Sequence, residues 1–333
     1  MLLNYIIQRC LQLIPLLIAI SIIIFIIIQL PPGDYLTTYI QQLKLSGTDV
    51  SLSAIENLKK QYSLDKPAYI QYFVWVTNII TKGDFGQSFQ WNRPVSEVIG
   101  DRLGLTMLIS IITLIFVWVV SIPIGIYSAT HQYTAFDYIF TFIGFIGLAV
   151  PGFLIALFAI YFVFVNTGVA LTGLFSPAFN GQPWSFAKFL DMLPRTWLPI
   201  FVIGMSSTAG LIRVTRGMML DELQKQYVIT ARAKGVPETR LLFKYPVRIA
   251  INPLISTIGW TLPGIISGEA IVSIVLNMPT TGPVLLKALM TQDMYLAGSF
   301  LLILSVLTVI GTLLSDILLA FIDPRIRFGG VAE

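Results

Sequence analysis

The chain has 333 residues, of which 21 are Lys or Arg and 17 are Asp or Glu, so only 11% of its side chains are charged. A soluble domain carries about 25% charged residues, and it needs them to cover its surface. The composition excludes a disordered chain and an ordinary soluble enzyme, and a net charge of +4 excludes a nucleic-acid-binding protein built on a basic surface. It predicts an all-α integral membrane protein, because helices satisfy their own backbone in lipid.

Six apolar runs are long enough to cross a bilayer, which takes about 20 residues in a helix. The first occupies residues 1–30. It is too long for the apolar part of a signal peptide and lacks a small-x-small cleavage site before Pro31, so we expect a permanent transmembrane helix. The other five form a core over 103–322. They lie at about 105–129, 139–169, 196–212, 249–276 and 297–322.

The segment 213–248 sets the predicted orientation. It carries eight basic residues, whereas the short loops 167–195 and 277–298 carry two and one. Short loops rich in Lys and Arg stay in the cytoplasm. With six spans, both termini and the tail 323–333 are then also cytoplasmic.

Residues 31–102 are predicted to lie outside the cytoplasm, between the first two spans. They hold seven basic and seven acidic residues, but a segment of this length is too long for the charge rule to apply. The stretch 51–80 is amphipathic and predicts two helices. Ser53 and Glu56 have the spacing of a capping box for the first of them.

Several kinds of chemistry are absent from the sequence. The dipeptide Gly-Lys never occurs, so the chain has no P-loop for a nucleotide. A single cysteine, Cys10, and a single histidine, His131, argue against a disulfide, a metal site and a Ser-His-Asp triad. If the protein consumes energy, another chain or an ion gradient must supply it.

Three acidic residues lie in or beside the predicted spans. Glu269 is the only charge between Arg248 and Lys287. It either lines a substrate path or faces a partner subunit, or else it snorkels or is hydrogen-bonded within the bundle. For Asp316, near the inner end of the last span, we expect a helix-end or interhelical contact. Asp137 is placed at the short inner turn between the second and third spans.

The basic segment 213–248 has the pattern of an ordered helix. Six of its residues recur at helical spacing. These positions are Leu220, Leu223, Tyr227, Thr230, Ala231 and Lys234. Gly235 is expected to end this helix, and Pro237 to stand in the first turn of the next. Ala231 and Ala233 would let a partner backbone approach closely. The alternative is a basic helix resting on anionic lipid headgroups.

Residues 227–255, YVITARAKGVPETRLLFKYPVRIAINPLI, resemble the EAA loop of transmembrane subunits of ABC importers. More narrowly, they are similar to the peptide/nickel permease family, whose loop typically reads Y-V-x-T-A-R-A-K-G. Residues 61–103, NMPTTGPVLLKALMTQDMYLAG at 277–298 and the ending DPRIRF resemble the same family. The resemblance runs from about residue 6 to 328.

This resemblance implies a permease of the type I ABC importer fold in a bacterial inner (plasma) membrane. Such a subunit is not itself an enzyme. It would pair with a second homologous permease subunit, two cytoplasmic ATPase subunits that bind ATP and Mg, and an extracytoplasmic binding protein. No cofactor would be bound by this chain. The resemblance assigns the coupling helix and its turn to Tyr227, Thr230, Ala231, Arg232, Ala233, Lys234 and Gly235.

The sequence departs from the family pattern at three positions. Tyr245 stands where many members have His, and Gly104 where many have Pro. Ser273 replaces a frequent Glu, and the acid appears instead at Glu269, one helical turn earlier on the same face. Glu269 and Ser273 are our candidates for the translocation pathway.

We expect a peptide substrate, with nickel, opines and sugars as the family's other substrates. An ion-coupled secondary transporter and a membrane scaffold without transport activity are the rival functions.

Overall fold

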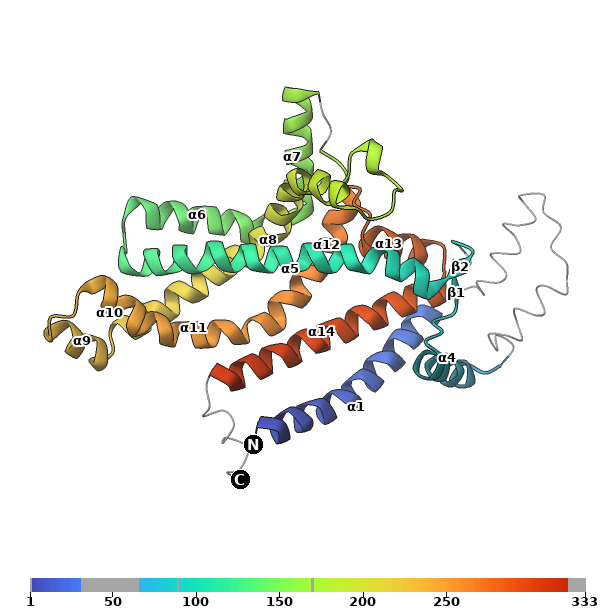
Figure 1. The fold of residues 1–333 in the computed structure, drawn as a ribbon, viewed down its shortest axis with the longest axis horizontal. Helices are drawn as coiled ribbons and strands as arrows, with labels where there is room; N and C mark the ends of the chain where they lie inside the picture. The colour runs from blue at the N-terminus through green and yellow to red at the C-terminus, as the bar shows by residue number, and fades with distance from the viewer. Residues whose placement is uncertain (1, 31–65, 89, 169–170, 323–333) are drawn as a thin grey trace. The chain divides into compact units, whose positions relative to one another are not determined.

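The computed structural model describes residues 2–30, 66–88, 90–168 and 171–322, so the predicted capping box at Ser53 and the tail 323–333 lie outside the described residues. The described part is almost entirely helical (Figure 1). Its helices are α1 (Leu2–Gln29), α4 (Ala68–Lys82), α5 (Val95–Thr130), α6 (Ala135–Ala149), α7 (Gly152–Thr167), α8 (Phe186–Leu223), α9 (Gln226–Ala233), α10 (Glu238–Lys244), α11 (Pro246–Ser256), α12 (Ile258–Val275), α13 (Thr281–Met290), α14 (Met294–Ile322) and the 3-10 helix η1 (Pro177–Phe179). Strands β1 (Gln87–Ser88) and β2 (Arg93–Pro94) pair antiparallel, Ser88 opposite Arg93.

The described helices make the chain a multi-pass membrane protein. Four of them, α1, α5, α8 and α14, are each long and apolar enough to cross a bilayer. The predicted span 139–169 is instead the pair α6 and α7, bent by 104° and counted as a fifth crossing if taken together. The bend falls at Pro151, which has no N–H to continue the α6 hydrogen-bond ladder.

The predicted span 249–276 is also divided, into α11 and α12. Pro253 lies inside α11 and removes one backbone donor from it. Thr257 then closes the helix, since both its N–H and its hydroxyl bond to the Leu254 carbonyl, at 3.0 and 2.6 Å. The division into α11 and α12 therefore has a local cause, although hydropathy alone predicted one continuous helix.

The helices group into two compact units, each assembled from separate stretches of the chain. The first comprises Met1–Cys10, Leu105–Pro279 and Thr308–Glu333. Its core contains buried side chains of α5, α7, α8 and α12, including Ile109, Ala156, Val202 and Val272. The turn between α5 and α6 lies at the same end of this unit as α9 and α10 (Figure 1).

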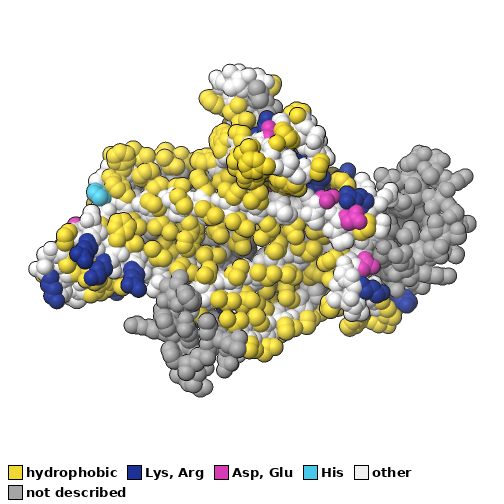
Figure 2. Space-filling model, viewed as in Figure 1, with side chains coloured by type: hydrophobic (Ala, Val, Ile, Leu, Met, Phe, Trp, Pro, Cys, Tyr) yellow, Lys and Arg dark blue, Asp and Glu magenta, His cyan; other side chains and the backbone are white. Residues whose placement is uncertain are grey.

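Lipid-compatible side chains cover the outer faces of α6 and α7 in this first unit. Phe142, Phe158, Tyr161 and Phe162 are each at least 64% exposed. Figure 2 shows hydrophobic side chains over α6, while Lys and Arg gather at the end that carries α9 and α10. This distribution matches a helix pair in a membrane with a basic, solvated end.

The second unit comprises Leu11–Gly104 and Thr280–Leu307. Here α4 packs on α1, with the rings of Phe25 and Trp75 5.8 Å apart. The Ser88 hydroxyl donates to Asp293 Oδ2 at 2.6 Å, and Asp293 is fully buried. Two stretches that resemble the permease family, 61–103 and 277–298, are thus held together by a buried hydrogen bond.

Candidate functional site

The basic segment 213–248 contains parts of four helices, α8, α9, α10 and α11, where the sequence predicted one helix up to Gly235 and a second after it. Leu220 and Leu223 belong to the last turns of α8, whereas Tyr227 begins the first turn of the separate helix α9. At Lys225 the backbone is extended, with φ −70° and ψ 145°, so the chain turns there. The spacing of Leu220, Leu223, Tyr227 and Thr230 runs on across this turn, so the sequence pattern did not reveal the break between α8 and α9.

The helices α9 and α10 share a small core, which fixes which side of α9 faces outward. Val228, Ala231 and Leu241 are buried in it, and Tyr227, Val236 and Tyr245 pack around them. Ala231 is therefore an internal packing residue, contrary to our expectation that it admits a partner backbone. The outward face of α9 is formed by other residues. These are Gln226, Ile229, Thr230 and Ala233.

The turn between α9 and α10 is built as predicted around Gly235. Its φ is +76°, which glycine adopts without strain. The N–H of Lys234 bonds to the Thr230 carbonyl at 3.0 Å and that of Val236 to the Ala231 carbonyl at 3.3 Å, so the last carbonyls of α9 are satisfied. Pro237 immediately precedes α10 as its N-cap, one residue before the predicted position.

An ion pair spans this turn. Arg232 donates through Nη2 to Glu238 Oε1 at 2.6 Å and through Nε to Oε2 at 3.1 Å. Hydrogen bonding from Arg232 lowers the pKa of the Glu238 carboxyl. Both side chains are about half exposed, so the pair fixes the turn's geometry more than it stabilises the fold.

A hydrogen bond from Tyr227 to Glu222 joins the end of α8 to α9. Burial, and then the neighbouring Glu222 carboxylate, raise the pKa of the Tyr227 phenol. The phenol therefore stays protonated and remains a donor at physiological pH. This contact links the start of α9 to the last turn of α8.

Replacing Tyr227 by Phe should loosen that connection. We expect a loss of about 1 kcal/mol, the usual net value of such a hydrogen bond, and faster amide exchange in α9. Hydrogen–deuterium exchange of the purified protein measures this. Tyr245→Phe is the matched control, because its ring packs in the same core and no hydrogen bond of its hydroxyl is described. Equal exchange in both variants would contradict the assigned role of the bond.

The two pathway candidates lie on α12. Glu269 and Ser273 are both fully buried, and the Ser273 hydroxyl donates to the Ala270 carbonyl at 2.9 Å. They lie beside Val272 and Leu276, which belong to the core of the first unit. In this conformation neither side chain reaches solvent, so a role in translocation requires α12 to move.

Asp316 makes an interhelical contact, as predicted. Its Oδ2 lies 3.5 Å from Nε of Arg9. This ion pair joins the first turns of α1 to the end of α14 within the first unit.

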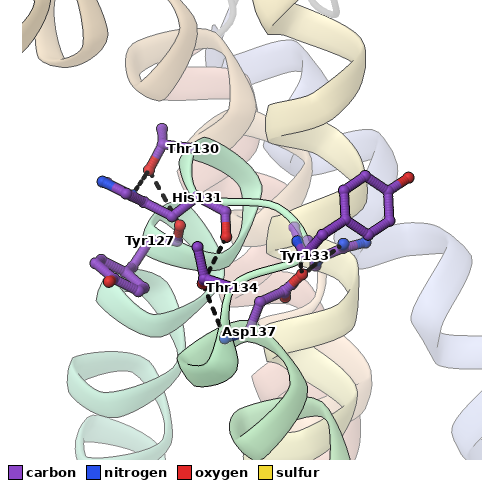
Figure 3. Close-up of polar contacts among 7 residues, drawn as sticks. Tyr127, Thr130, His131, Tyr133, Thr134 and Asp137 are labelled. Atoms are coloured by element: carbon purple, nitrogen blue, oxygen red, sulfur yellow. Dashed lines mark hydrogen bonds and ion pairs between the residues drawn. The ribbon is translucent and has the colours of Figure 1, made fainter.

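The sequence did not predict the ion pair between Asp137 and Arg216. Asp137 is 3% exposed and accepts two hydrogen bonds from Arg216, from Nε at 3.2 Å and from Nη2 at 3.1 Å. Thr134 caps α6 by accepting the Asp137 N–H at 3.4 Å (Figure 3). The Thr-x-x-Asp spacing marks such a helix start, but α6 and α8 are too far apart in sequence for the Arg216 partner to be recognised.

Comparison with known proteins identifies relatives along the whole chain. Residues 121–328 match the family of binding-protein-dependent transport system inner membrane components, and residues 2–110 match the N-terminal part of such membrane components. The oligopeptide transport system permease protein AppB of Bacillus subtilis is 38% identical over 328 residues, covering 97% of this chain and 99% of that protein.

Two further relatives match over similar lengths. The dipeptide transport system permease protein DppB of Alkalihalophilus pseudofirmus is 29% identical, covering 98% of this chain and all of that protein. The oligopeptide transport system permease protein OppB of Haemophilus influenzae is 27% identical with the same coverage. With its apolar helices and ordered basic loop, the chain belongs to the family of binding-protein-dependent transport system inner membrane components.

Proposed function

We propose that this chain is the permease subunit of an ABC importer that takes up peptides. A second homologous permease, two cytoplasmic ATPase subunits and an extracytoplasmic binding protein complete the assembly, and ATP and Mg are bound by the ATPases alone. The observation that carries the proposal is the near full-length similarity to a permease named for oligopeptide transport. The absence of a P-loop from the sequence supports an energy source in separate chains.

The proposed topology has six spans, formed by α1, α5, α6–α7, α8, α11–α12 and α14. The Arg9–Asp316 ion pair supports an even number, because it joins the start of the first span to the end of the last. Both termini then lie on one side, and the eight basic residues of 213–248 favour the cytoplasmic side of a bacterial inner membrane. Residues 31–102 are the extracytoplasmic segment and 103–322 the permease core.

In the proposed mechanism α9 is the coupling helix. Its outward face, with Ile229, Thr230 and Ala233, docks on an ATPase, and Arg232, Lys234 and Gly235 shape the turn that follows. The shared core with Leu241 makes α9 and α10 move as one body. Because α8 enters this body and α11 leaves it, closure of the ATPases tilts both helices and changes the exposure of Glu269 and Ser273 on α12.

The test is uptake into proteoliposomes that contain this chain with its partner permease and ATPases. We expect peptide uptake that needs ATP and the loaded binding protein and continues when an uncoupler abolishes the ion gradient. Uptake that is lost with the uncoupler at constant ATP would instead establish a secondary transporter. Offering nickel, opines and sugars in parallel decides the substrate class, and uptake of one of these without peptide uptake would refute the peptide assignment.

A further inference from the structure

The ion pair between Asp137 at the start of α6 and Arg216 in α8 has no role in the proposed coupling through α9. Arg216 places two nitrogens on the two carboxylate oxygens, and its own side chain is 30% exposed. Asp137 also accepts the Tyr133 N–H at 3.1 Å, and it lies in the first turn of α6, where the helix dipole favours a negative charge. The carboxylate is thus held from three directions.

The turn that precedes Asp137 is a rigid piece of structure. Tyr133 has a φ of +61°, an unusual conformation for a side-chain-bearing residue. Thr134 donates to the His131 carbonyl at 2.8 Å while it caps α6. His131 stacks on Tyr127, with ring centroids 4.4 Å apart, and contacts the Thr130 hydroxyl at 2.9 Å (Figure 3). The turn can therefore transmit a displacement applied to Asp137.

The other partner lies on the helix that leads into the coupling helix. Three residues after Arg216, Met219 is fully buried in a cluster with Ala129 of α5 and with Val247 and Ala250 of α11. Leu223 and Leu242 pack against the same cluster. The end of α8, the α5–α6 turn and the helices beside α9 are therefore in direct contact at one end of the first unit.

We propose that the Asp137–Arg216 pair is a transmission contact that makes the α5–α6 turn move together with α8 during the transport cycle. The inference rests on the proposed importer function. Movement of α9 reaches α8 through Glu222 and Tyr227, and Arg216 passes it to α6. The apolar cluster at Met219 tolerates sliding because dispersion contacts are not directional, whereas the bidentate pair fixes both distance and orientation.

The cost of burying the charges supports a positional role. A buried ion pair adds little net stability, because desolvation offsets the attraction, and its better attested use is to specify one arrangement of elements. Lysine cannot replace Arg216 in this role, since a single ammonium cannot place two parallel donors on one carboxylate.

The experiment compares Arg216→Lys and Asp137→Asn with Arg213→Gln in the reconstituted complex. Arg213 lies on α8 three residues before Arg216 and is exposed, so it controls for loss of a positive charge. The readouts are the melting temperature, the basal ATPase rate, the stimulation of ATPase by loaded binding protein, and the amount of substrate moved per ATP. A merely structural pair would lower the melting temperature and, through the amount of folded complex, both ATPase rates, but it would leave the substrate moved per ATP unchanged.

For both pair variants we expect assembly and basal ATPase within about twofold of the unaltered complex, and at least a tenfold loss of substrate moved per ATP. Arg213→Gln should behave like the unaltered protein. An unchanged transport ratio would overturn the inference. So would failure of even Arg216→Lys to assemble, because the pair would then serve folding. If the unaltered complex shows no ATP-dependent uptake, the proposed function fails instead.

Discussion

Ala233→Arg should abolish most ATP-driven uptake without unfolding α9 and α10, whereas Ala231→Arg should unfold them. The two alanines lie two residues apart on α9, yet Ala233 is exposed and Ala231 is 7% exposed inside the core with Val228 and Leu241. A large cation at Ala233 blocks close approach of an ATPase backbone and leaves the core intact. We expect at least a tenfold loss of uptake with an unchanged melting temperature.

At Ala231 the same side chain has no room. Overpacking the core and burying the guanidinium are expected to cost about 3 kcal/mol, seen as rapid proteolysis between α8 and α11. Uptake and limited proteolysis, measured on the same preparations, separate the two effects. Normal uptake by Ala233→Arg would remove α9 from the coupling role. A loss of stability at Ala233 equal to that at Ala231 would show that the outward face is misassigned.

The second large effect is expected at the crossing of α5 and α8. A Cβ added to Gly125 would lie 2.6 Å from Cβ of Thr215 and 3.0 Å from the Ile212 carbonyl. Neither atom is the flexible end of a long side chain, so the helices must separate. Gly125→Ala should therefore destabilise the protein by about 1–3 kcal/mol and lower the melting temperature in detergent.

Gly210→Ala is the matched control for this prediction. Gly210 also lies inside α8, and nothing stands within 4 Å of a Cβ built there. Alanine is the better helix former by up to about 1 kcal/mol, so this variant should melt at the same temperature or slightly higher. If both variants shift the melting temperature in the same direction and by the same amount, the close approach at Gly125 does not contribute to stability.

The basic segment 213–248 shows which features the sequence predicts and which it does not. Gly235 was recognised as the end of a helix, because a glycine after a helical pattern has a specific backbone role. The inward orientation of Ala231 was missed, since it depends on packing against Leu241 of the following helix. Small size alone does not reveal whether a residue faces a partner or its own core.

The membrane spans, too, were predicted only in part from the sequence. Long uninterrupted runs such as α1 and α14 were located from hydropathy, because span length is set by the bilayer. The breaks at Pro151 and Thr257 were not anticipated, since a proline within a membrane helix is often tolerated. The pairing of Asp137 with Arg216 depends on the crossing of α6 and α8, which no local pattern encodes.

The Arg9–Asp316 contact also constrains the order in which the protein can fold during synthesis. The two partners are about 300 residues apart in sequence, and synthesis proceeds at about 5–20 residues per second. The α1 helix is therefore synthesised roughly 15–60 s before α14, which carries its ion-pair partner Asp316. Neither compact unit is contiguous in sequence, and both include part of α14, so neither is complete until α14 has been made. The membrane helices made before α14 therefore need protection from aggregation and proteolysis during that interval. Chains truncated before α14 should be degraded and should not accumulate as a folded fragment.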